Sequence, residues 1–201
     1  LFKVAHQNNT LWTLERICRN RALQGLPQLQ DNQKLFLNVE PDSLHDPDLL
    51  DQPFSDRLRA AGLQPQQIVL EITEHTAIQD FPKVRRMITR CRQQGYRVAM
   101  DDVGSGYAGL QAIAEIAPDY IKMDMSLVRN IHHHMIKREL VSTICRFSDS
   151  TGITLVAEGV ETAEELQSLV TAGVRCAQGF LFCRPSKSPG EPDWDSIPLP
   201  T

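Results

Sequence analysis

The sequence has 201 residues, 41% of them hydrophobic, which is enough to build one domain with a sizeable core. Its formal net charge of −4 argues against a nucleic-acid groove or an anionic membrane as the main partner. No apolar run approaches the ~18 residues that span a bilayer, and no signal-like segment is present. Five scattered cysteines without a CxxC pair predict reduced thiols in a cytoplasmic protein. The chain begins without Met, so we interpret it as part of a longer protein, which could carry a membrane anchor elsewhere.

Short apolar runs predict six strands, at residues 35–40, 68–74, 97–102, 119–124, 153–161 and 174–182. Helical periodicity lies between several of them, at residues 81–95, 133–152 and 162–174. Thr162 with Glu165 three residues later predicts a capping box, and Gly95 and Gly152 mark helix ends. The alternation predicts βαβ units around a parallel sheet. The Pro-rich residues 186–201 are expected to form a surface tail outside a domain of residues 1–185.

Each predicted strand ends in a polar residue suited to a functional site. In chain order these residues are Asn38, Glu71, Asp101 with Asp102, Lys122, Glu158 and Gln178. A (β/α)₈ barrel builds its active site at this rim, and a doubly wound open sheet also gathers residues at its carboxyl ends. Six such strands in a row favour the barrel.

The acidic and amide side chains of this rim predict a site for a divalent cation. Each of these residues, taken alone, is more often a turn or surface residue. Six strand ends would then need six separate explanations, whereas one shared site explains them together. Clustered carboxylates repel one another, and Mg²⁺ or Mn²⁺ relieves this repulsion. If the strand pleat breaks at Asp102, both Asp101 and Asp102 can turn into the mouth of the barrel. Two cations about 3.5–4 Å apart would then act on a phosphoryl centre.

Motifs in the same order resemble the EAL-domain family of cyclic di-GMP phosphodiesterases over residues 1–185. The matching stretches are LFLNVEPDSL, IVLEITE, DDVGSGYAGL, DYIKMDMSLV, LVAEGVET and AQGFLFCRP. The resemblance implies a TIM-barrel-like α/β fold and hydrolysis of one 3′–5′ phosphodiester bond of cyclic di-GMP, which gives linear pGpG.

The resemblance also implies a role for each matching residue. It implies Asn38, Glu71 and Asp101 as ligands of one metal, and Asp101, Asp102 and Glu158 as ligands of a second. Lys122 would hold or polarise the attacking water, with Glu158 as a candidate base. Gln178 would contact the substrate. The residues expected to support the site and its loop are Glu74, Asp124 and Glu161.

The Glu-Ala-Leu tripeptide of the family, whose Glu is a metal ligand, does not occur in this sequence. We expect that the first strands of the barrel are missing because the chain is truncated, and the alternative is a degenerate family member. Smaller departures are Val103 for Phe, Ala108-Gly109 for Ser-Ser, Met125 for Arg and Phe180 for Tyr, none of which removes a metal ligand. The family further implies a homodimer, fused to sensory or GGDEF-type domains.

Four functions compete at this point. A metal-dependent phosphodiesterase is favoured because the other predicted metal ligands are retained. The alternatives are a receptor that binds cyclic di-GMP without cutting it, an interaction domain without ligand, and another barrel hydrolase such as a glycosidase. Elsewhere, Trp12 predicts a helix that packs on the barrel, and Cys176 and Cys183 are expected to be small apolar residues beside a core strand.

Overall fold

The structure, a computed structural model, describes residues 1–40, 52–74, 77, 80–104, 109–186, 192, 194, 195 and 197, with backbone alone for 52 and 53. The chain divides into two compact units. The first contains Leu1–Ile72 and Thr76–Val98, and the second contains Thr73–His75 and Ala99–Ser186. No helix in the described part of the chain is both long and apolar enough to cross a membrane.

The strands follow one another in chain order within a six-stranded sheet. They are β1 (Leu35–Asn38), β2 (Ile68–Thr73), β3 (Arg97–Val103), β4 (Tyr120–Met123), β5 (Thr154–Ala157) and β6 (Cys176–Ala177). The pairs β1–β2, β3–β4, β4–β5 and β5–β6 are parallel, as the apolar runs predict. The strand predicted at residues 153–161 is too long, because the chain turns at Gly159, with φ of 69°, soon after β5. The strand predicted at residues 174–182 is also too long, since β6 contains only Cys176 and Ala177.

The first unit contains the helical elements α1 (Phe2–Gln7), α2 (Leu11–Gln24), α4 (Gln52–Ala60), η2 (Pro65–Gln67) and α6 (Phe81–Gln93). Helix α6 follows its predicted pattern, since it buries Val84, Met87, Ile88 and Cys91. Asp80 caps its start by accepting a hydrogen bond from the Lys83 amide at 2.9 Å. Burial raises the pKa of the Cys91 thiol to about 12, so this cysteine stays protonated and packs as an apolar residue.

Helix α2 differs from its prediction. Trp12 is 44% exposed, and the buried residues of the helix are Glu15, Arg19 and Leu23. Arg19 Nη1 lies 3.3 Å from Glu15 Oε2, and Glu15 Oε1 accepts a hydrogen bond of 3.0 Å from the Glu40 amide. The buried face of α2 therefore carries a charged pair, and its Glu15 accepts a hydrogen bond from the main chain just beyond β1.

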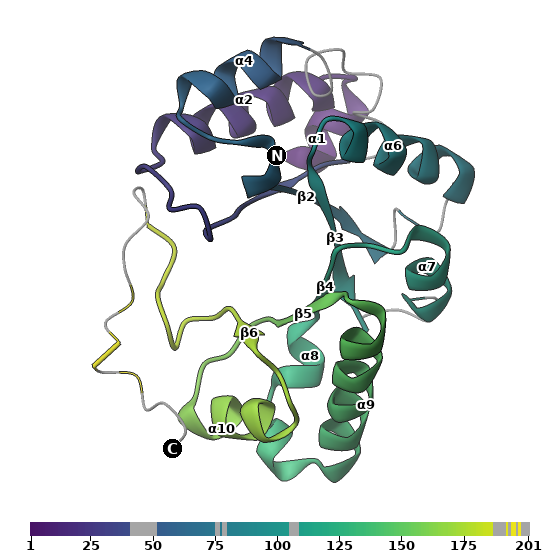
Figure 1. Cartoon of the computed structure of the whole chain (residues 1–201), viewed down its shortest axis with the longest axis vertical. Helices are drawn as coiled ribbons and strands as arrows, with labels where there is room; N and C mark the ends of the chain where they lie inside the picture. The colour runs from purple at the N-terminus through teal and green to yellow at the C-terminus, as the bar shows by residue number, and fades with distance from the viewer. Residues whose placement is uncertain are drawn as a thin grey trace. The chain divides into compact units, whose positions relative to one another are not determined.

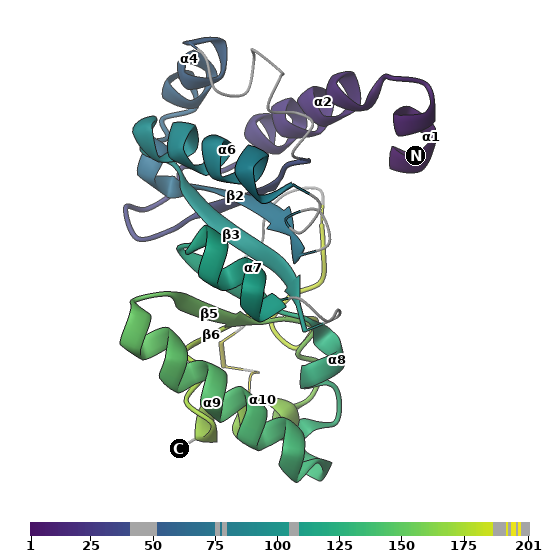
Figure 2. The same cartoon turned by 90° about the vertical axis from the view of Figure 1, so that its right-hand side faces the viewer.

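The second unit contains the helical elements α7 (Gly109–Ile116), α8 (Met125–Val128), η3 (Ile131–His133), α9 (Met135–Thr151) and α10 (Ala163–Thr171). Helices α8, α9 and α10 lie on one side of β4, β5 and β6, with α9 packed against β5 (Figure 1; Figure 2). Helix α9 ends at Gly152, which has a left-handed φ of 74°, as predicted. Cys176 and Cys183 are exposed, so the prediction that they pack as small apolar residues beside a core strand is wrong.

The predicted capping box of α10 is confirmed, since Thr162 Oγ1 accepts from the Glu165 amide at 3.2 Å and Glu165 Oε2 accepts from the Thr162 amide at 3.3 Å. We expect Thr162→Ala to lower the free energy of unfolding by about 1 kcal/mol, because it removes an acceptor from the helix start. Urea denaturation followed by circular dichroism measures this. Thr143→Ala, at an exposed position within α9, is the control and should change stability by less than about 0.5 kcal/mol.

Candidate active site

The end of β3 carries the two adjacent acids, and the strand is irregular there. The register between β3 and β4 shifts between Met100 and Val103, and Asp102 adopts a left-handed φ of 57°. Non-glycine residues rarely adopt this conformation, but Asp is among those that tolerate it best. The Asp102 amide donates to Asp101 Oδ1 at 3.1 Å. The pleat break considered from the sequence is therefore present, and the two carboxylates are not held on opposite faces of a regular strand.

Three carboxylates gather at this end of the second unit. One oxygen from each of Asp101, Asp102 and Glu158 lies within 4.8 Å of the other two. Lys122, at the end of β4 and with only 7% of its side chain exposed, places Nζ 3.0 Å from Asp101 Oδ1 and 2.7 Å from Glu158 Oε1. One ammonium among three carboxylates leaves an excess of negative charge.

The pKa of Asp102 reflects both burial and the negative charges around it. Burial raises its pKa above the usual value, and the charges of Asp101, Asp124 and Glu74 raise it further, against an opposing effect of Lys122. Clustered carboxylate oxygens are ligands that Mg²⁺ and Mn²⁺ prefer in proteins. The donor set in the second unit thus fits a divalent cation.

Asp102→Asn is expected to stabilise the metal-free protein by about 0.5 kcal/mol near neutral pH, because it removes one of the mutually repelling charges. Since the folded state raises the pKa of Asp102, the wild type loses stability as pH rises through that pKa. Asn tolerates the left-handed φ, so the backbone stays as it is. Urea denaturation with EDTA, between about pH 4 and pH 7, should show an advantage of the variant that grows with pH. A constant difference across this range contradicts the prediction.

Asn38 and Glu71 are neighbours in the first unit. The register of the parallel strands β1 and β2 pairs Asn38 with Glu71, and the Val39 amide donates to the Glu71 carbonyl at 2.9 Å. Paired residues of adjacent strands leave the sheet on the same face. Glu71 is 4% exposed. An amide and a carboxylate therefore lie side by side where β1 ends, and both groups carry oxygen donors that suit a hard cation.

Glu74 follows β2 and is 2% exposed. Its Oε2 accepts a hydrogen bond of 3.2 Å from the amide of Gly104, the residue directly after β3. A Cβ at Gly109, the first residue of α7, would lie 3.2 Å from the same oxygen. Glu74 thus contacts both ends of the loop it is expected to brace, while residues 105–108 lie outside the described part of the chain.

The remaining predicted residues lie in the second unit. Asp124 caps α8, since its Oδ1 accepts from the Ser126 amide at 2.9 Å. Gln178 is exposed, and its carbonyl accepts from the Val160 amide at 3.1 Å. Gly179 packs directly against the Val160 backbone, where a Cβ would clash. This close approach explains why a glycine follows Gln178.

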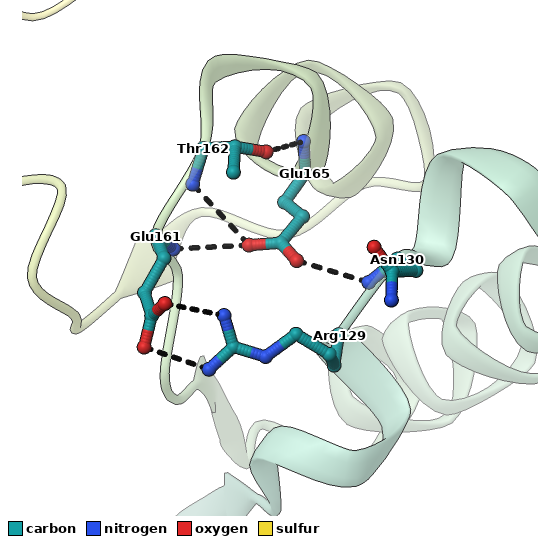
Figure 3. Close-up of polar contacts among 5 residues, drawn as sticks. All are labelled: Arg129, Asn130, Glu161, Thr162 and Glu165. Carbon is teal, nitrogen blue, oxygen red and sulfur yellow. Dashed lines mark hydrogen bonds and ion pairs between the residues drawn. The ribbon is translucent and has the colours of Figure 1, made fainter.

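Glu161 forms an ion pair that sequence reasoning missed. Arg129 Nη1 lies 2.6 Å from Glu161 Oε2, and Nη2 donates to Oε1 at 2.7 Å (Figure 3). The pairing raises the pKa of Arg129 and lowers that of Glu161. No spacing rule could have revealed it, because the two residues are 32 positions apart.

A sequence model of the EAL domain matches residues 1–185. The chain belongs to the EAL domain family. It is 33% identical over 160 residues to the cyclic di-GMP phosphodiesterase RocR of Pseudomonas aeruginosa, a match that covers 80% of this chain and 41% of RocR. The family predicted from the motifs is therefore confirmed.

Solved EAL structures share the fold. BlrP1 of Klebsiella pneumoniae, in a complex with manganese and cyclic di-GMP, superposes with a TM-score of 0.83 at 39% identity, covering 92% of this chain and 47% of that one. A standalone EAL protein from Vibrio cholerae O395, in its c-di-GMP bound form, gives a TM-score of 0.85 at 26% identity, covering 97% of this chain and 84% of that one. The predicted α/β fold of TIM-barrel type is thus confirmed.

The chain is shorter than its curated relatives. It spans 22% of a signaling protein from Caulobacter vibrioides and 24% of the oxygen sensor protein DosP of Escherichia coli. In these relatives the region that matches this chain is therefore part of a longer protein.

Proposed function

We propose that this EAL domain hydrolyses cyclic di-GMP to linear pGpG with the help of divalent cations. The observation that carries the proposal is the group formed by Asp101, Asp102 and Glu158, with the Lys122 ammonium between two of the three carboxylates. Membership of the EAL family supports the substrate, since RocR bears the name of a cyclic di-GMP phosphodiesterase and BlrP1 binds cyclic di-GMP with manganese.

Each unit would contribute its own ligands. Asn38 and Glu71 would hold one cation, and Asp101, Asp102 and Glu158 a second. When bound, Mg²⁺ or Mn²⁺ would supply Lewis-acid stabilisation of the charge that builds on the phosphoryl oxygens.

Side chains of this protein would orient the attacking water and accept its proton. Lys122 donates to Asp101 and Glu158, which orients both carboxylates and places an ammonium where the attacking water can be held. Glu158 would take the proton from that water. The water oxygen then bonds to phosphorus, the bond between phosphorus and the 3′ oxygen breaks, and the 3′ oxygen takes up a proton from the solvent. Gln178, exposed at the end of β6, would contact the substrate.

Incubation of the full-length protein with cyclic di-GMP tests the proposal. Formation of pGpG with Mg²⁺ or Mn²⁺, and its loss with EDTA, is the expected result, read by chromatography. Tight binding without product would instead identify a receptor, and absence of binding would exclude both functions.

We also propose that residues 1–185 form a domain of a longer cytoplasmic signalling protein that dimerises. Its relatives support the greater length, because the matched region is less than half of RocR and about a quarter of DosP. Light scattering of the full-length protein, with and without cyclic di-GMP, measures the oligomeric state.

A further inference from the structure

The loop after β5 is held at several points by neighbours in the second unit. The Glu158 amide donates to the Met123 carbonyl at 3.1 Å, and the Val160 amide donates to the Gln178 carbonyl. Gly159, between them, packs so closely on Met125 that a Cβ would lie 2.6 Å from the Met125 Cβ. The main chain on either side of Glu158 is therefore fixed to the ends of β4 and β6.

A polar network fixes the far end of the same loop (Figure 3). Glu165, which is 1% exposed, accepts from the Asn130 amide at 2.9 Å through Oε1 and from the Glu161 amide at 3.0 Å through Oε2. The Arg129 guanidinium pairs with both oxygens of Glu161. Bidentate pairs of this kind are the more directional and stronger class of charged hydrogen bond.

Arg129 is itself held in place. Lys137 Nζ donates to the Arg129 carbonyl at 2.8 Å and to the Ser126 carbonyl at 2.6 Å. Lys137 of α9 thus holds the main chain of Arg129, whose side chain binds Glu161.

We propose that Arg129 is a positioning residue for Glu158. By clamping Glu161 it holds the loop of residues 158–162 in the conformation that places the Glu158 carboxylate beside Asp101 and Asp102. The guanidinium group of Arg129 also neutralises the charge of Glu161, so this carboxylate adds no uncompensated negative charge to the acidic region. The inference rests on the proposed function, since it concerns how the site is prepared for a cation.

The test uses Arg129→Gln in the full-length protein and has two readouts. In metal-free protein, amide hydrogen exchange of residues 158–162 should accelerate by at least about tenfold, while exchange within α6 stays unchanged. The affinity for Mn²⁺, measured by calorimetry, should fall by about tenfold, the usual effect of losing a partner that orients a metal ligand.

Two further variants separate this role from a general loss of structure. Exchanging the pair, Arg129→Glu with Glu161→Arg, should recover most of the Mn²⁺ affinity. Arg175→Gln, which breaks an exposed pair with Asp149 in the same unit, is the matched control and should change neither readout.

Unchanged exchange in Arg129→Gln overturns the inference, as does a Mn²⁺ affinity within about twofold of the wild type. If the wild type makes no pGpG while both readouts move as expected, the proposed hydrolysis fails and the positioning role stands.

Discussion

Asp101→Asn is expected to lower kcat for cyclic di-GMP by about 10³-fold in the full-length protein, an effect typical of losing one preorganised electrostatic group. Asp101 contacts Lys122 at 3.0 Å and belongs to the group of three carboxylates, so the substitution weakens both the cation site and the orientation of Lys122. Asn keeps the size of the side chain and an acceptor oxygen, and the fold should be retained. Steady-state formation of pGpG with saturating Mn²⁺ measures the effect.

Asp149→Asn provides the matched control for this result. Asp149 is an exposed acid in the same unit, paired with Arg175 on the surface, and its replacement should leave kcat within about twofold of the wild type. An Asp101→Asn protein that retains more than about a tenth of the wild-type kcat would show that this carboxylate is not central to catalysis.

Lys122→Met should lower the free energy of unfolding by about 3 kcal/mol in EDTA, because removing one partner leaves buried charges uncompensated. The ammonium lies within 3.0 Å of both Asp101 and Glu158, and all three side chains are less than 20% exposed, at 7%, 13% and 17%. Met preserves most of the apolar length of Lys. A divalent cation can replace the lost positive charge, so the difference from the wild type should narrow to about 1 kcal/mol in saturating Mn²⁺. Urea denaturation under the two conditions measures both values.

The control for the lysine variant is Lys3→Met, which changes an exposed lysine in α1. It should alter stability by less than about 0.5 kcal/mol in either condition. If Lys122→Met is as stable as the wild type in EDTA, the ammonium does not compensate the carboxylates, and the electrostatic account of the site is wrong.

Buried glutamates recur beside the strand ends that carry the predicted site. Glu15 accepts from the Glu40 amide after β1, and Glu74 accepts from the Gly104 amide after β3. Glu165 accepts main-chain amides of the segments after β4 and β5. These hydrogen bonds tie the main chain of each loop to a buried side chain. Such support keeps catalytic groups in place before a ligand arrives.

The sequence alone determined the order and type of the main elements. Helical periodicity located α6 and α9, and the apolar runs located the parallel strands. Both are predictable because a buried helix face or strand requires apolar residues at regular positions, which can be read from one sequence. The capping box at Thr162 and the glycine stop at Gly152 were also predictable, since both depend on residues a few positions apart. The motifs at the strand ends identified the family, which the match over residues 1–185 confirms.

Only the tertiary structure decided how the polar side chains are paired. The buried face of α2 is formed by Glu15 and Arg19 where Trp12 was expected, because Glu15 bonds to an amide 25 residues away. The bond between Arg129 and Glu161 likewise joins residues 32 apart. Local patterns record which face is buried, whereas ion pairs form between whichever charged groups the folded chain brings together. The group of carboxylates in the second unit is likewise a product of the tertiary structure, since it joins Asp101 and Asp102, with its left-handed φ, to Glu158 more than 50 positions away.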